Sequence, residues 1–212
     1  MIRQRLTEIL YFFRSNLRGL LLLTFPFALI GALITQGLGE PLEMVGEKMA
    51  INSESAVALM VLYPFALGAK VAGIHLLAQG QPLAPATLLR AIALLWPVMF
   101  GISLVLGLAV GVGLMMLLFP AAWFYARLGY APILAVTERR GVLDALREAW
   151  LRSRPQQVDL FLVTLLLGAL LYAVGKLLAL TLEGNEGNLA INLLVRTANE
   201  LLMCLFTIAF YR

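Results

Sequence analysis

A few polar side chains interrupt the long apolar runs of this sequence. Arg127 lies near the middle of one run and Glu200 near the middle of the last. On a helix, Asn192, Arg196 and Asn199 share one face, and Glu200 borders it. Charges inside a bilayer are costly. We therefore expect Arg127 and Glu200 to form an ion pair that joins two spans.

Arg196 is the competing partner of Glu200, because the two residues are one helical turn apart. That local pair leaves Arg127 alone, so we favour the Arg127–Glu200 pair. Lys70 and Lys176 lie nearer to span ends, where a lysine ammonium can reach the interface. Two roles remain open for the polar residues: fixing helix packing, or forming a substrate or proton site at the midplane.

Common enzyme and metal-site motifs are absent from the sequence. It contains no G-x-S-x-G, H-E-x-x-H or P-loop motif. The single histidine, His75, excludes a multi-histidine metal site, and the single cysteine, Cys204, excludes an intrachain disulfide. We therefore expect a protein that is not an enzyme and has no cofactor.

The composition predicts an all-α integral membrane protein. Of the 212 residues, 61% are hydrophobic and only 13% are charged, with a mean hydropathy of +0.90. Soluble domains are about half apolar and about a quarter charged. We expect one transmembrane domain over 1–212, with six helices in three hairpins. The expected spans are 19–35, 56–79, 92–109, 114–136, 158–180 and 189–211.

Two of these boundaries depend on an interpretation. A signal peptide competes with the first span, but its apolar run is long and no A-x-A-like site follows it. The segment 91–126 has no charged residue and is too long for one span. We expect a tight turn at Gly107, Gly111 or Gly113 to divide it.

Two short amphipathic helices are expected at the membrane surface, over 2–14 and 141–154. In the second, one face is apolar, and the opposite face carries Arg147 and Arg152. The apolar face consists of Val142, Ala145, Leu146, Ala149 and Trp150. Such a helix lies at a headgroup layer or on the ends of the spans, with Trp150 at the interface. It is either a linker or a dedicated site for lipid or a partner.

The arginines predict the orientation. With six spans, both termini and the segment 137–154 lie on the side that is rich in arginine, and that side is expected to be cytoplasmic. The other side has Lys48 and six glutamates. The basic residues flank apolar runs, so orientation explains the net charge of +4 better than nucleic acid does.

The order of these features resembles the YciC-type family of bacterial inner-membrane proteins. The matching residues are Phe12-Phe13-Arg14 before the first span, Leu89-Arg90-Ala91-Ile92 before the third, and Ala131-Pro132-Ile133 before the basic helix. More distantly, the chain is similar to the membrane domain fused to some glycerophosphodiester phosphodiesterases. Those proteins commonly have Pro-Gly at the position where this chain has Pro120-Ala121. The resemblance implies six spans and a bacterial inner membrane. It brings no activity and no catalytic residues.

Two functions remain. We favour a non-enzymatic inner-membrane protein with a scaffold role or a role in envelope homeostasis. The alternative is a small transporter or lipid-handling protein, which predicts a cavity that reaches Arg127 and Glu200 from one side. The expected partners are membrane lipids. A membrane-protein partner or a homo-oligomer is left open.

Overall fold

The computed structural model describes residues 2–45, 48–116, 118–181 and 188–211. It is 89% helical, which confirms the all-α class. Within these residues, five helices are long and apolar enough to cross a membrane. They cover Leu17–Leu38, Ser53–Ala78, Leu88–Met116, Arg154–Leu178 and Leu189–Tyr211.

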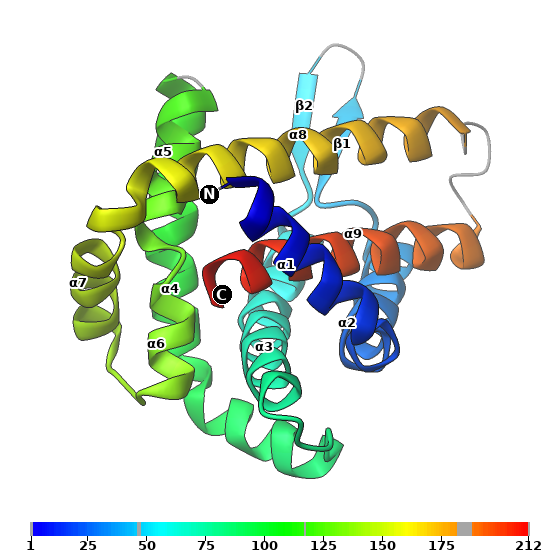
Figure 1. Cartoon of the computed structure of the whole chain (residues 1–212). Helices are drawn as coiled ribbons and strands as arrows, with labels where there is room; N and C mark the ends of the chain where they lie inside the picture. The colour runs from blue at the N-terminus through cyan, green and yellow to red at the C-terminus, as the bar shows by residue number, and fades with distance from the viewer. Residues whose placement is uncertain (1, 46–47, 117, 182–187, 212) are drawn as a thin grey trace.

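The first helices follow the expected order. Helix α1 (Ile2–Ser15) leads into α2 (Leu17–Leu38), and α3 (Ser53–Ala78) packs against α2. Gly73 permits this contact, because a Cβ there would lie 2.3 Å from a methyl group of Leu23. Between α2 and α3, strands β1 (Leu42–Val45) and β2 (Lys48–Ile51) form an antiparallel hairpin (Figure 1). The polar composition of residues 37–55 predicts only a connection between two spans, so the hairpin is an addition to that prediction.

The expected turn at Gly107, Gly111 or Gly113 is wrong. Helix α4 (Pro85–Met116) continues past all three glycines. In a bilayer each backbone group must be satisfied internally, so a helix tends to persist through glycine. Gly107 and Gly111 have open space where a Cβ would be, whereas Gly113 meets the backbone of Ala121.

The expected fourth span, 114–136, is not one helix. It contains the end of α4, then α5 (Leu118–Leu128) and α6 (Ala131–Thr137). Pro132 lies in the first turn of α6, where its missing N–H is tolerated, and the chain breaks just before it, at Gly129 and Tyr130. Helices α5 and α6 both pack against α4 (Figure 1). Together they return alongside α4, although neither is long enough to span a bilayer.

The remaining helices complete the bundle. Helix α7 (Val142–Arg152) and the 3-10 turn η1 (Arg154–Gln156) lead into α8 (Gln157–Thr181), and α9 (Leu189–Tyr211) follows. The sequence 183–188 (EGNEGN) predicts a short acidic turn between the last two spans, and of this turn only Asn188 lies within the described residues. Helix α7 packs against α4, α5 and α6, at the edge of the fold in Figure 1.

The tightest packing lies at one end of the spans. Leu20 near the start of α2, Ile74 near the end of α3 and Ile208 near the end of α9 are all fully buried in one cluster. Ile9 and Phe12 of α1 join this cluster, so α1 lies against the end of α9 (Figure 1). At the opposite ends of α4 and α8, large apolar side chains are exposed, including Met115, Met116 and Leu177. The largest buried cluster therefore lies at one end of the bundle, and exposed apolar side chains gather at the other.

Candidate functional site

Among the charged side chains whose burial the structure describes, the most deeply buried belongs to α3. Lys70 is 2% exposed, and its Nζ lies 2.8 Å from Oε2 of Glu200 on α9. The expected pairing of Glu200 with Arg127 is therefore wrong. Burial removes water from an ammonium, so it needs a partner, and Glu200 is that partner. We had expected Lys70 to reach the interface, but Ala69 and Val71 beside it are buried by neighbouring helices.

Arg196 forms a second polar centre, one turn before Glu200. Its Nε donates to Asn192 Oδ1 at 2.9 Å, and its Nη2 donates to Thr35 Oγ1 on α2 at 3.0 Å. Asn192 also donates to Thr35, and Glu40 lies 3.5 Å from Arg196 Nη2. Arg196 Nη1 lies 3.5 Å from the point where a Cβ on Gly31 would be, so the missing side chain leaves room beside the guanidinium.

A pocket of about 250 Å³ connects these charges. Its polar and charged residues belong to α9 except for Tyr63, and α2 and α3 supply the apolar walls. The lining residues are Phe27, Ala28, Gly31, Leu59, Leu62, Tyr63, Ala66, Arg196, Asn199 and Glu200. Of the five residues expected to form the intramembrane network, three line this pocket and Asn192 supports it. Arg127 takes no part in it.

An apolar cavity lies on the other side of Tyr63. Its volume is about 500 Å³, and Tyr63 lines both it and the polar pocket. Residues of α3, α4, α5 and α9 surround this cavity. The Tyr63 ring also lies 6.0 Å from Lys70 Nζ. A polar pocket and an apolar cavity with one shared wall are suited to a molecule with a charged end and an apolar body.

Arg127 belongs to a different contact, between α5 and α7. Its guanidinium carbon lies 5.3 Å from the Trp123 ring and 4.9 Å from the Trp150 ring, and Nη1 donates to the Trp150 carbonyl at 3.2 Å. Aromatic faces attract cations, so the two indoles take the place of the carboxylate that we expected. The Arg127 side chain joins α7 to α5 and does not line the polar pocket.

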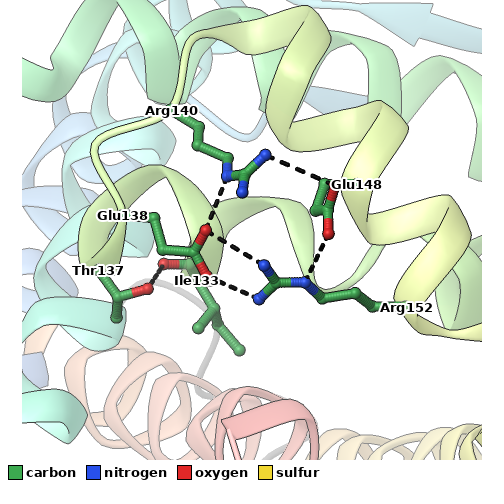
Figure 2. A network of polar contacts seen from close by, with 6 residues as sticks. All are labelled: Ile133, Thr137, Glu138, Arg140, Glu148 and Arg152. Atoms are coloured by element: carbon green, nitrogen blue, oxygen red, sulfur yellow. Dashed lines mark hydrogen bonds and ion pairs between the residues drawn. The ribbon is translucent and has the colours of Figure 1, made fainter.

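Four charged side chains hold the start and end of α7 together (Figure 2). Arg152 donates to Glu138 at 2.6 Å and to Glu148 at 2.8 Å, and Arg140 donates to Glu138 at 2.7 Å. Arg140 also lies 3.5 Å from Glu148, which closes the ring. Arg147 is exposed and is not one of the four side chains of this ring. The opposite face of α7 is buried at Ala145 and Ala149.

Glu138 makes the α7 attachment sensitive to acid. Hydrogen bonds from Arg152 and Arg140 hold the pKa of the Glu138 carboxyl below its usual value. Its contribution to stability is therefore complete above the usual glutamate pKa of about 4.3, and it is lost as pH falls through the lower folded value. We expect amide exchange in α7 to show less protection at about pH 3 than at about pH 6, after correction for intrinsic rates.

The matched variants separate this effect from general acid unfolding. Glu138→Gln should lower the protection of α7 at the higher pH and remove most of its pH dependence. Glu8→Gln changes an exposed carboxylate on α1 and should leave α7 unchanged. Equal pH dependence in wild type and Glu138→Gln would contradict the assignment.

The sequence alone does not assign Lys70, Thr35 or Tyr63 to the polar site. Thr35 and Tyr63 carry no distinctive signal in an apolar sequence. Comparison of the chain with protein-family models, with curated proteins and with solved structures finds no match. In the described part of the chain, no three side chains of the metal-binding types gather at one place.

Proposed function

We propose that this is a lipid-handling protein of the bacterial inner membrane that binds an anionic amphiphile. Arg196 binds the anionic headgroup in the polar pocket, and the cavity beyond Tyr63 receives the apolar part. The observation that carries this proposal is the shared wall, because Tyr63 lines both spaces. Guanidinium groups form strong, directional hydrogen bonds with phosphate and carboxylate.

The Lys70–Glu200 pair has a supporting role in this proposal. Glu200 neutralises Lys70, so the positive charge of Arg196 remains the main attraction for an anion. Glu40, at 3.5 Å and half exposed, is held only weakly. An arriving anion can therefore replace Glu40 without leaving a buried charge unpaired.

We also propose membership of the YciC-type family, with both termini cytoplasmic. The tightly packed end of the spans includes residues of α1 and of the end of α9. The arginine-rich α7 packs in a separate cluster, against α4 and α6. The polar pocket lies along the first half of α9 and the second half of α2. Under this orientation the pocket opens in the periplasmic half of the bilayer.

The orientation is tested by cysteine labelling of intact cells after Cys204→Ala. An impermeant thiol reagent should label Ser53→Cys and should not label Gly141→Cys. Both positions are exposed, and a Cβ at Gly141 meets no other atom within 4 Å. Labelling at Gly141→Cys with none at Ser53→Cys would reverse the orientation.

The headgroup assignment is tested by lipid binding to the purified protein. We expect phosphatidylglycerol to bind more tightly than phosphatidylcholine with the same chains. Arg196→Gln should weaken phosphatidylglycerol binding by roughly tenfold or more, since it removes hydrogen bonds between charged groups. Arg147→Gln removes the same charge from the exposed face of α7 and should change the affinity little. Equal affinities for wild type and Arg196→Gln would contradict the proposal.

One observation favours the scaffold role as a second candidate. Arg127 lies in a packed helix contact, as a purely structural arginine would. A scaffold needs no ligand, so it predicts that neither lipid binds selectively. The same binding experiment therefore separates the two functions.

A further inference from the structure

A second apolar cavity adjoins the first. Its volume is about 620 Å³, and it lies between α4, α5, α8 and α9. The two cavities share Val110, Tyr125 and Met203 in their walls. The Tyr125 ring is held edge-on against Phe206 and Phe210, at centroid distances of 5.6 and 5.5 Å. Two apolar chambers of similar size therefore lie side by side, and the Tyr125 ring, held by two phenylalanines, is part of the wall that they share.

Each chamber is lined by a serine or threonine whose hydroxyl oxygen is buried and unsatisfied among the described residues. Ser103 lines the first chamber and Thr164 the second, and both hydroxyl oxygens are buried. Neither oxygen has a hydrogen-bond partner among the residues that the structure describes. A buried hydroxyl without a partner costs free energy. Rotation about χ1 can turn each hydroxyl towards its chamber, where a ligand carbonyl would satisfy it.

We infer that the ligand is a two-chain, ester-linked lipid with an anionic headgroup. One chain occupies each chamber, and the carbonyl of each ester accepts a hydrogen bond from Ser103 or Thr164. This inference rests on the proposed function, because it places the headgroup of the same molecule beside Arg196. A single-chain lipid would leave one chamber empty and one hydroxyl unsatisfied.

Two glycines of α8 provide a test variant and its control. Gly168 lines the second chamber, and a Cβ there would meet no atom within 4 Å. Gly168→Leu should therefore fill the chamber without disturbing α8, and leucine favours a helix more than glycine does. Gly175→Leu is the matched control, because Gly175 lies on the same helix, is equally open and lines neither chamber.

The experiment measures binding of defined lipids to the full chain by native mass spectrometry from detergent. The two probes are dioleoyl phosphatidylglycerol and its single-chain lyso form. We expect wild type and Gly175→Leu to prefer the two-chain lipid by about tenfold. Gly168→Leu should lower the two-chain affinity to that of the lyso lipid and should leave lyso binding intact.

The outcomes separate this inference from the function on which it rests. Equal affinities of wild type for the two lipids, with binding still sensitive to Arg196→Gln, would overturn the two-chain inference alone. The same holds if Gly168→Leu keeps the full preference. Absence of selective binding of either lipid would overturn both proposals.

A second measurement needs no chamber variant and tests the hydroxyl groups. The dialkyl ether analogue of phosphatidylglycerol has the same headgroup and two chains of the same length, but it lacks both carbonyls. Wild type should bind it about three- to tenfold more weakly than the ester lipid, for the loss of one or two net hydrogen bonds. Equal binding of ester and ether lipids would contradict the ester assignment even if Gly168→Leu fails to fold.

Discussion

Lys70→Met is expected to lower the free energy of unfolding by about 3–5 kcal/mol, the usual cost of breaking a buried ion pair by removing one partner. The methionine fills a similar volume, so the loss comes mainly from Glu200, whose charge is left without the ammonium at 2.8 Å. Glu200 lines the polar pocket and is partly exposed. Water in the pocket moves the expected loss towards the lower end of the range.

Two controls give this prediction its specificity. Lys176→Met makes the same replacement on α8, where the lysine is exposed, and should cost little. The double variant Lys70→Met/Glu200→Leu removes both charges and should be more stable than Lys70→Met alone. Reversible unfolding in mixed micelles measures all three. A Lys70→Met loss no larger than that of Lys176→Met would show that the pair contributes little.

The Lys70–Glu200 pair shows which features of the fold follow from hydropathy and which do not. The sequence predicts the long helices well, because length and apolar content decide which segments enter a bilayer. Helix α9 covers the expected residues 189–211, and α8 extends the expected 158–180 by one residue at each end. The partner of a charge depends instead on which helices touch. Lys70 and Glu200 are far apart in the sequence, and no spacing rule links them.

The failure of the fourth span has a local physical cause. Gly129 and Pro132 are helix breakers, but they lie within an apolar run that is typical of a continuous span. The prediction placed the turn at the three glycines of α4 instead. The real interruption depends on proline at the first turn of α6. Gly107 and Gly111 do not form a turn, because α4 continues through them and its backbone groups are hydrogen-bonded within the helix.

The polar site was predicted only in part, because the contacts between helices do not follow from spacing in the sequence. Arg196, Asn199 and Glu200 could be placed on one side of a helix from their spacing. The other half of the site consists of Thr35 and Tyr63, which belong to α2 and α3. Their roles arise only from packing. Arg127 was placed wrongly because a carboxylate was the obvious partner for it, whereas two tryptophans, one before it in α5 and one in α7, supplied the contact.

Gly113→Ala and Gly111→Ala should change the stability in opposite directions. A Cβ on Gly113 would lie 2.6 Å from both the Cα and the backbone nitrogen of Ala121, and a backbone cannot move aside as a flexible side chain can. Helices α4 and α5 must separate to accept it, at a cost of about 1–3 kcal/mol, typical of overpacking. Gly111 meets nothing within 4 Å. Alanine there should stabilise the helix by up to about 1 kcal/mol.

The same pair of variants links packing to the proposed site. Helix α5 carries Tyr125, which is part of the wall that the two apolar chambers share. Displacement of α5 in Gly113→Ala should therefore weaken two-chain lipid binding as well as lower the unfolding free energy, whereas Gly111→Ala should leave binding unchanged. If Gly113→Ala loses stability but keeps its preference for the two-chain lipid, the α4–α5 contact is structural only, and the Tyr125 wall does not decide which lipid binds.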